Sequence, residues 1–332
     1  MYLIGVDIGG TKCRVSLAQE KNGELIFISR ENARNTEGQG YDKILELLLT
    51  DIRILLPQIK KLDAIGISCG GPLDLKRGLI LSPPNLPGWD RVPVTDFFSE
   101  AVGVPVFLQN DANAGALAEW KHGAGRGCKN MVFLTFGTGL GAGLILDGRL
   151  YTGANGQAGE IGHIRLSEYG PAGYGKLGSF ESFCSGGGIS RLGRSMVEAE
   201  FQLGRRPAIC PSPDGLDALN AKAIGIAAER GDPLARKIYA EAGKKLGAGL
   251  SIIIDIFNPE MIIIGSVFAR NRNEIWPAAL EVIEREALTI PRESCRIVPC
   301  MLGDEIGDYS AITTAEYEMK TRRETLHQAS VV

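Results

Sequence analysis

One pattern occurs twice in this chain and narrows the folds that the chain can adopt. Residues 1–26, MYLIGVDIGGTKCRVSLAQEKNGELI, run from an apolar strand through a glycine-rich turn to a second strand and then a Gly-containing turn. Residues 130–151, NMVFLTFGTGLGAGLILDGRLY, repeat this order with little identity. Repeats usually form stacked arrays, but two copies alone favour a pair of similarly built domains.

The remaining segments predict mixed α/β domains around the two copies. Apolar residues recur at helical spacing from about residue 40 to 59, and apolar strands follow at 62–68 and 104–109, the second leading into a helix at 113–122. The later half is mostly helical, with helices expected at 189–203, 215–230, 233–256, 273–288 and 308–324 and strands at 261–265 and 296–302. We expect the last residues, 326–332, to be disordered.

Composition bounds the kind of protein. The chain has 332 residues, 44% of them apolar and 23% charged, and a formal net charge of −3. This length suits two domains, and the charge favours no nucleic-acid partner. Seven scattered cysteines without a C-x-x-C pair predict reduced thiols in a cytoplasmic protein. No signal peptide is expected, because Asp7 comes too soon, and no membrane span, because Asp255 and Pro259 interrupt the most apolar later stretch.

The first glycine turn, DIGGTK at residues 7–12, predicts a phosphate site. It lies between two strands, so it is neither a P-loop nor a dinucleotide fingerprint, both of which open a helix. Gly9 and Gly10 let backbone N–H groups approach an anion closely, and Thr11 and Lys12 add donors. Asp7, at the strand end, could hold a hydrated Mg²⁺ ion on the phosphates.

The second glycine turn, FGTGLGAG at residues 136–143, offers the same physics in the second copy. Gly137, Thr138 and Gly139 would supply a facing cradle. A tight hairpin without a ligand is the alternative for either turn alone. Two such turns, one in each repeated unit, favour a phosphate tail that is clamped between two domains.

Five motifs in order resemble one family. They are DIGGTK, LQNDANAGALAE, TFGTGLGAGLILDG, GEIGH and NPEMIIIG. Over roughly residues 1–315 they are similar to the ROK family, which comprises sugar kinases and related repressors of the hexokinase–actin superfamily. The resemblance implies an α/β, two-domain ribonuclease-H-like or actin-like ATPase fold with an interdomain cleft, and ATP and Mg²⁺ as cofactors. It divides the chain into a smaller domain, 1–112 plus 312–332, and a larger domain, 113–311.

The resemblance places the catalytic base at Asp111, in the N-D-A-N stretch. A sugar hydroxyl must lose its proton as it attacks the γ-phosphorus, and a loose transition state needs only a modest base that orients the hydroxyl. Asp111 also lies near the start of the expected helix, whose dipole favours the ionised carboxylate. A plain helix N-cap is the structural alternative for this residue.

The resemblance also implies the other contacts of sugar and nucleotide. The expected sugar-binding residues are Gly71, Asn85, Asn110, Asp111, Glu160, His163 and Glu181. The carboxylate of Glu160 and the imidazole of His163 suit adjacent hydroxyls, because one accepts a hydrogen bond and the other can donate. On the adenosine side the family has a Gly-Gly pair, of which this chain keeps Gly265 and has Ser266 next.

One motif departs from the family pattern. Most ROK kinases hold a structural zinc ion with a histidine and the cysteines of a C-x-C-G-x-x-G-C-x-E stretch, which here reads AGYGKLGSFE, residues 172–181. The three cysteine positions hold Ala172, Tyr174 and Ser179, and Cys184 lies beyond the last of them. One histidine and one displaced cysteine cannot build a tetrahedral site. We therefore predict no structural zinc and a loop held by packing, for example of Tyr174 and Phe180.

Three functions fit this pattern. The first is a glucokinase-like transfer of phosphate from ATP to a hexose, glucose or an N-acetylated sugar, giving the sugar 6-phosphate. The second is a sugar-sensing regulator without kinase activity; such proteins usually carry a helix-turn-helix domain before the first turn, where six residues precede Asp7 here. The third is a non-sugar ATPase, which would not need the hydroxyl-binding set. The expected partners are a sugar and ATP, and a homodimer is common among relatives.

Overall fold

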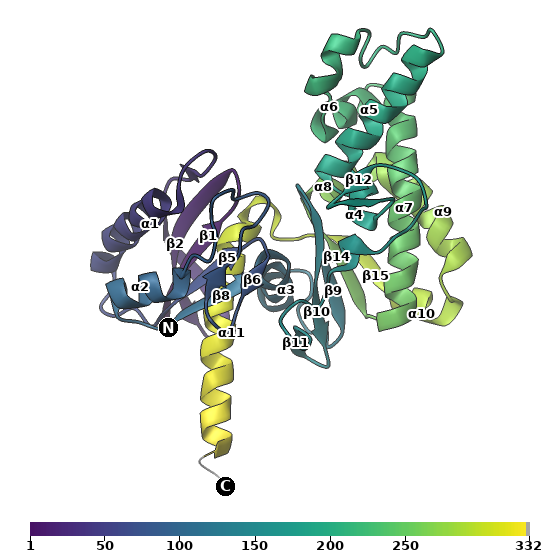
Figure 1. The fold of residues 1–332 in the computed structure, drawn as a ribbon. Coiled ribbons are helices and arrows are strands. Elements are labelled where there is room, and N and C mark those ends of the chain that lie inside the picture. The colour runs from purple at the N-terminus through teal and green to yellow at the C-terminus, as the bar shows by residue number, and fades with distance from the viewer. Residues whose placement is uncertain (330–332) are drawn as a thin grey trace. The chain divides into compact units, whose positions relative to one another are not determined.

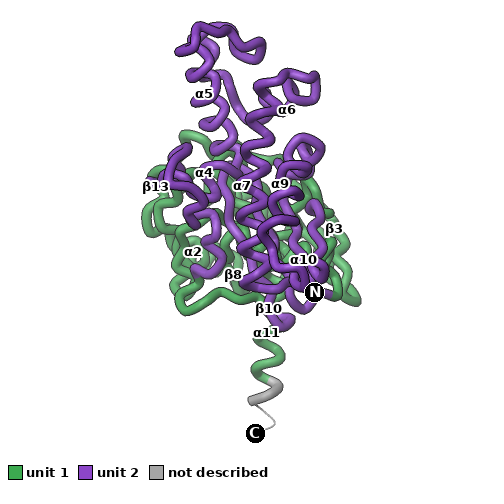
Figure 2. Tube along the Cα trace, turned by 90° about the vertical axis from the view of Figure 1, so that its right-hand side faces the viewer, with its two compact units in different colours: residues 1–127, 150–156, 301–332 green, residues 128–149, 157–300 purple. Residues whose placement is uncertain are grey.

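The computed structural model describes residues 1–329, and the chain divides into two compact units (Figure 2). Unit 1 comprises residues 1–127, 150–156 and 301–332, and unit 2 comprises residues 128–149 and 157–300. Helix α3 (Asp111–His122) belongs to unit 1, where it packs against α11 (Ile306–Ala329). The domain division after residue 112 would separate α3 from that neighbour; it stays a prediction.

A mixed sheet forms the centre of unit 1 (Figure 1). β1, β2 and β3 form an antiparallel meander, and β5 and β8 extend it in parallel. This arrangement confirms the strands expected from the sequence. The spatial order is β3 (Glu24–Arg30), β2 (Lys12–Lys21), β1 (Tyr2–Ile8), β5 (Ala64–Cys69) and β8 (Val106–Asn110), with β4 (Arg34–Asn35) paired to β2 and a separate ribbon of β6 (Leu73–Asp74) and β7 (Leu79–Ile80).

Helices cover both faces of this sheet. Ile4 and Val6 of β1 lie in a core with residues of α1 (Tyr41–Leu55) and α2 (Val94–Val102). Leu3 points to the other face, where it clusters with residues of α11. The alternation follows from the two-residue period of a strand, and the helical pattern predicted for residues 40–59 is confirmed by α1 and the 3₁₀ turn η1 (Leu56–Gln58).

Two strand glycines allow α11 to lie close to the sheet. Gly5 and Gly66 are register partners in the parallel β1–β5 pair. A Cβ atom on Gly66 would lie 2.1 Å from the carbonyl oxygen of Ala311, and one on Gly5 would lie 2.9 Å from the backbone nitrogen of Ile312. Side chains at these positions would separate the helix from the strands, so the two glycines set the spacing of the layers.

Unit 2 is built on a second sheet with the same strand order. The antiparallel β9–β10 pair carries the second glycine turn, and β14 and β15 join β9 in parallel, as β5 and β8 join β1 in unit 1. The internal repeat predicted from the sequence is therefore a repeat of topology. The order within unit 2 is β10 (Leu140–Leu146), β9 (Met131–Phe136), β14 (Met261–Ile264) and β15 (Arg296–Pro299). β11 (Arg149–Tyr151) runs from the end of residues 128–149 into residues 150–156, which belong to unit 1.

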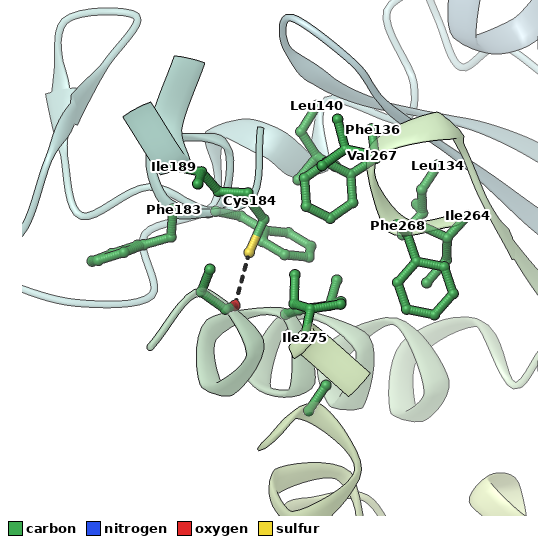
Figure 3. Close-up of a cluster of buried hydrophobic side chains, with 14 of the residues drawn as sticks. Leu134, Phe136, Leu140, Phe183, Cys184, Ile189, Ile264, Val267, Phe268 and Ile275 are labelled. Carbon is green, nitrogen blue, oxygen red and sulfur yellow. Dashed lines mark hydrogen bonds between the residues drawn. The ribbon is translucent and has the colours of Figure 1, made fainter. Parts of the chain in front are cut away.

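The helices of unit 2 enclose a large apolar core, in which aromatic side chains such as Phe136 and Phe268 meet aliphatic ones (Figure 3). Three long helices match the sequence expectation, a fourth, α6, covers part of an expected helix, and short elements lie between them. The four are α5 (Gly186–Gln202), α6 (Ala221–Glu229), α7 (Pro233–Phe257) and α9 (Arg272–Glu286); the short ones are η2 (Ile161–His163), β12 (Ala172–Gly173), β13 (Lys176–Leu177), α4 (Phe180–Phe183), η3 (Pro213–Ala218), α8 (Ser266–Arg270) and α10 (Thr289–Ser294).

Two predictions about helices were wrong in part. The helix expected at 215–230 is broken, because Leu219 is extended and the Asn220 side chain accepts a hydrogen bond from the Ala223 N–H at 3.0 Å, which caps a new helix. Residues 326–329, expected to be disordered, are the last residues of α11, which follows η4 (Gly303–Glu305); residues 330–332 lie outside the described part. Within residues 1–329, no helix is both long and apolar enough to span a membrane.

Candidate active site

The first glycine turn joins β1 to β2 in unit 1 and is held from two sides. The N–H of Gly9 donates to the carbonyl of Lys12 at 3.0 Å, and its carbonyl accepts from the Thr36 hydroxyl at 2.7 Å. A Cβ atom on Gly10 would lie 2.5 Å from the carbonyl oxygen of Asn85. The turn therefore has bare backbone packed against the Asn85 segment, which brings the predicted Gly9, Gly10 and Asn85 together.

Asp7 stands beside this turn as a poorly solvated carboxylate. Although part of its surface stays accessible, burial raises the pKa of Asp7 to about 7, and the charges of Asp308 and Asp111 act in the same direction. The charge of Lys12 and a hydrogen bond with Ser68 oppose this shift. An acidic group in such surroundings gains from a bound cation, and the place of Asp7 near Mg²⁺ stays a prediction.

Asn110 and Asp111 lie where β8 runs directly into α3. Asn110 is the N-cap, because its Oδ1 accepts hydrogen bonds from the N–H groups of Ala112 at 2.9 Å and Asn113 at 3.3 Å. Asp111 is the first helical residue, and its Oδ1 accepts from the Ala112 N–H at 2.8 Å. The residue that caps the helix is therefore Asn110 and not Asp111.

The other predicted side chains of unit 1 lie around the backbone of Gly70 and Gly71. A Cβ atom on Gly70 would lie 3.4 Å from Nδ2 of Asn85 and 3.8 Å from Oδ2 of Asp111, and one on Gly71 would lie 3.4 Å from Nδ2 of Asn110. Two amides and one carboxylate thus surround the same short backbone segment. Desolvation by the surrounding groups raises the pKa of Asp111, although the residue itself is exposed to solvent, and hydrogen bonds from the backbone of Ala112 and of Asp111 itself oppose the shift.

In unit 2, the second glycine turn is docked onto the start of α5. The N–H of Gly137 donates to the carbonyl of Gly139 at 3.2 Å, and the carbonyl of Gly137 accepts from the Gly186 N–H at 2.8 Å. Ser185 caps α5 by accepting from the Gly188 N–H at 2.9 Å. Since a helix N-terminus favours anions, the turn and α5 together form a surface that suits a phosphate.

The predicted hydroxyl-binding residues of unit 2 lie against the end of this turn. Glu160 precedes a single 3₁₀ turn and His163 is its last residue. The His163 N–H donates to the Glu160 carbonyl at 3.2 Å, and both residues are exposed. Glu181, at the start of α4, directs Oε2 to the N–H of Leu140 at 3.0 Å. The structure thus brings Glu160, His163 and Glu181 to one end of β10.

A comparison with known proteins decides the family, since the model described as ROK family matches residues 3–315. The chain belongs to the ROK family. A glucokinase of Thermotoga maritima is 34% identical to this ROK protein over 272 residues, which cover 81% of this chain and 83% of that one. A xylose repressor of Caldicellulosiruptor bescii is 33% identical over 269 residues, which cover 80% of this chain and 65% of that one.

A solved ROK structure confirms the predicted fold class. It is a ROK family glucokinase from Streptomyces griseus in complex with glucose and AMPPNP, 30% identical in sequence, with a TM-score of 0.76 over 96% of this chain and 100% of that one. The α/β, actin-like two-domain fold expected from the motifs is therefore the fold of this chain. The ROK relatives include both kinases and repressors.

The loop in which the family pattern led us to look for zinc cysteines is held here by packing and hydrogen bonds. Phe180 is only 1% exposed, which supports its predicted packing role. Tyr174 is 68% exposed and its ring meets that of His163 edge-on at 6.3 Å between centroids, so its predicted packing role was wrong. Ser179 caps α4 by accepting from the Ser182 N–H at 3.2 Å. Cys184 lies in the apolar core of unit 2 and donates to the Ala242 carbonyl at 3.4 Å (Figure 3). Within residues 1–329, no three His, Cys, Asp or Glu side chains form a group that could hold a metal ion.

Gly265, the residue predicted on the adenosine side of the ROK site, lies at the end of β14 in unit 2. A Cβ atom there would lie 3.1 Å from both the Leu134 carbonyl oxygen and the Phe136 nitrogen of β9. Ser266, next in the chain, directs its hydroxyl to the Phe136 carbonyl at 3.4 Å. Gly265 therefore lies next to the strand that leads into the second glycine turn, and its contact with adenosine stays a prediction.

Sequence reasoning missed the charged contacts that join α11 to β2, β3 and α3. Asp308, in the first turn of α11, pairs with Arg14 and Arg30 at 3.2 Å each. At the far end of α3, Nε2 of His122 lies 2.7 Å from Oε2 of Glu316, and both side chains are almost fully buried. The signal in the sequence was weak, because each partner in α11 is separated from its counterpart by most of the chain.

Proposed function

We propose that this ROK protein is a sugar kinase that transfers the γ-phosphoryl group of ATP to a hexose hydroxyl, with Asp111 as the general base. The observation that carries the proposal is the position of Asp111 in the first turn of α3, beside the amides of Asn85 and Asn110. Glucose is the first substrate to test, because the Thermotoga maritima relative is a glucokinase and the Streptomyces griseus relative was solved with glucose.

The surroundings of Asp111 suit proton acceptance. Its Oδ1 is held by the Ala112 N–H, which fixes the plane of the carboxylate, while Oδ2 lies near Gly70. Desolvation raises the pKa of Asp111, which makes its ionised form a stronger base than an aspartate in water. A hydroxyl oriented by the neighbouring amides would pass its proton to Oδ2 as its oxygen attacks the γ-phosphorus.

The two glycine turns fit the phosphates of a nucleotide. A Cβ atom would collide with Asn85 at Gly10 and with Glu181 at Gly139, so both turns have bare backbone at their tips. The N-terminus of α5 adds N–H groups beside the second turn. Mg²⁺, when bound, would neutralise charge on the phosphates, and Asp7 fits a role in holding its water shell, because this carboxylate is poorly solvated and has two acidic neighbours.

A sugar-sensing regulator is the second candidate, favoured by the 33% identity to a xylose repressor. Both candidates bind a sugar, so sugar affinity does not distinguish them. Turnover of ATP that depends on a sugar does, since only the kinase transfers the phosphoryl group. A non-sugar ATPase, the third reading of the motifs, would release ADP at a rate that no sugar changes.

The test is an ADP-release assay on the purified protein with Mg²⁺-ATP and a panel of about twenty sugars, glucose and its N-acetylated relatives included. We expect sugar-dependent release of ADP. Asp111→Asn should lower kcat by about 10²–10⁴-fold, the usual size of a general-base contribution, and should change the Kd for the sugar little. Asp96→Asn is the matched control, because Asp96 is an exposed aspartate in the first turn of another helix of unit 1.

Each outcome has a separate meaning. Sugar binding without ADP release would favour the regulator, and ADP release without a sugar would favour the plain ATPase. Near-normal turnover of Asp111→Asn, with the wild type active, would remove Asp111 from its role while leaving the kinase function intact.

A further inference from the structure

Glu181 makes a contact that its expected role at the sugar does not explain. Its Oε2 accepts a hydrogen bond from the N–H of Leu140 at 3.0 Å. Leu140 is the first residue of β10 and follows Gly137–Gly139, the tip of the second glycine turn. A Cβ atom on Gly139 would lie only 2.8 Å from the same Oε2 atom. The carboxylate therefore lies against the last residue of the turn and leaves no room for a side chain there.

The same residue, Leu140, touches the segment that carries Glu160 and His163. A Cβ atom on Gly162, which lies between them, would be 2.0 Å from the carbonyl oxygen of Leu140 and 3.3 Å from Cβ of Glu181. The N–H of Leu140 thus faces Glu181, and its carbonyl faces the Gly162 backbone. One peptide segment at the start of β10 lies between the hydroxyl-binding residues and the phosphate turn.

The backbone of Glu181 is held by packing on one side and by a hydrogen bond on the other. Phe180, the preceding residue, is 1% exposed and packs where Gly249 of α7 leaves space for its ring. The Ser185 hydroxyl donates to the Glu181 carbonyl at 2.9 Å, and a Cβ atom on Gly188 would lie 2.5 Å from that carbonyl oxygen. The backbone of α4 at Glu181 therefore has little room to move when the carboxylate shifts.

We infer that Glu181 is a positioning residue for the phosphate turn, so that sugar and nucleotide binding are coupled through its carboxylate. Among residues 1–329, no donor is hydrogen-bonded to Oε1, which leaves that oxygen for a sugar hydroxyl, while Oε2 holds the turn. Because the carboxylate is planar and rigid, a hydroxyl that fixes Oε1 also fixes Oε2 and the Leu140 N–H. The inference rests on the proposed function, in that the bound groups are a sugar and a polyphosphate.

The coupling is reciprocal, as any coupling between two binding equilibria must be. Bound sugar should order the turn and tighten nucleotide binding, and bound nucleotide should tighten sugar binding by the same factor. Loss of a hydrogen bond to a charged acceptor costs enough to change affinity by about tenfold or more. A substitution at Glu181 should therefore change the affinity for the nucleotide measurably, even if the side chain does not contact the nucleotide.

Two variants separate the roles of the two oxygens. Glu181→Gln keeps an amide oxygen that can accept from the Leu140 N–H, but it loses the charge and places an NH₂ group toward the sugar. Glu181→Ala loses both contacts. The exposed Glu168, in the same loop region, gives the control Glu168→Ala. The measurements are the KM for ATP, the KM for the sugar, and the Kd for AMPPNP by calorimetry with and without the sugar.

We expect Glu181→Gln to raise the KM for the sugar about tenfold and to leave the Kd for AMPPNP within about threefold of the wild type, whereas Glu181→Ala raises both and abolishes the coupling. Gly139→Ala, which disturbs the contact from the side of the turn, should also raise the Kd for AMPPNP. Thermal unfolding of each variant reports whether the fold is retained.

An increase in the KM for the sugar alone, in both Glu181 variants, would overturn the inference, because Glu181 would then be only a sugar contact. Equal loss of AMPPNP affinity in the Gln and Ala variants would also overturn it, because the acceptor atom would not matter. A wild type that binds AMPPNP but releases no ADP with any sugar would refute the proposed function, and the AMPPNP measurements would still decide the contact between Glu181 and the turn.

Discussion

Asp7→Asn should stabilise the protein at neutral pH, although it removes a group that we place near Mg²⁺. The reason is the electrostatic environment of the carboxylate, whose pKa is raised from 3.8 to about 7 by burial and by the charges of Asp308 and Asp111. In addition, a Cβ atom on Gly307 would lie 2.4 Å from Oδ2 of Asp7, which shows how closely α11 approaches it. An amide of the same shape fills this space without a charge.

The magnitude follows from linkage. A difference between 3.8 and about 7 amounts to about 4 kcal/mol, at ~1.4 kcal/mol per pH unit. Asp7 is partly accessible, so screening by water reduces this value, and we take ~2 kcal/mol. Because the folded-state pKa is raised, the contribution of Asp7 to stability is fully present below pH 3.8 and is lost as the pH rises through about 7. The variant has no such loss, so its advantage should grow between pH 4 and pH 7.

The assay is urea unfolding of both proteins from pH 4 to pH 8, without nucleotide or Mg²⁺, followed by a probe of unit 1. At an m-value of about 2 kcal/mol/M, the expected gain moves the midpoint by about 1 M urea at pH 8 and by little at pH 4. Asp304→Asn, at an exposed aspartate of the same unit, is the control and should show no such difference. A gain that is equal at both pH values, or a loss at pH 8, would refute the electrostatic reasoning.

Two further predictions concern α11 and its contacts. Burial alone would raise the pKa of Glu316, but hydrogen bonds from His122 and Lys320 lower it, so its stabilisation is present above the unfolded pKa near 4.5 and is lost as the pH falls through the folded value. Glu316→Gln should therefore cost about 3 kcal/mol at pH 7 and progressively less below pH 4.5, and equal costs across this range in urea titrations would contradict the assignment. Gly66→Ala should cost about 1–3 kcal/mol, because its Cβ would meet the Ala311 carbonyl at 2.1 Å, whereas Gly40→Ala, with open space around it, should be nearly neutral by thermal unfolding.

The strands and turns could be predicted because their signals are local. Apolar runs, glycine turns and alternating burial each depend on consecutive residues. The repeat at residues 1–26 and 130–151 predicted two sheets with the same strand order. The Asn110–Asp111 pair could also be placed, since it interrupts an apolar strand before an Ala-rich helix. The assignment of the cap failed at this level, because two adjacent residues can both cap and only the backbone geometry decides between them.

The charged contacts of α11 could not be predicted, because they depend on which segments fold together. Arg14 and Asp308 are 294 residues apart, and His122 and Glu316 are 194 apart. The sequence around Asp308 or Glu316 does not indicate which residue pairs with it, and a glutamate in a C-terminal helix is usually solvated. A weaker clue was present in Gly5 and Gly66, since glycines inside otherwise buried strands often mark a close approach of another backbone.

The two copies of the repeat share a strand order but differ in the side chain beside the glycine turn. Asp7 is the penultimate residue of β1 and pairs with Arg14, and Thr135 is the penultimate residue of β9 and pairs with Gly141. The Thr135 hydroxyl accepts from the Gly141 N–H at 2.8 Å, so its position closes the hairpin. The carboxylate at the equivalent place in unit 1 has a raised pKa and acidic neighbours.

We therefore propose that a cation binds at the turn of unit 1 and not at its counterpart, where the acidic side chain, Glu181, is already held by the Leu140 N–H. Under the proposed function, a divalent ion would serve phosphates at the first turn, whereas the second turn relies on backbone donors and on α5. Thr135→Asp tests this difference between the two turns, because it places a carboxylate next to the second turn as well. If the variant bound ATP with unchanged affinity in the presence of Mg²⁺, the difference between Asp7 and Thr135 would not matter for function.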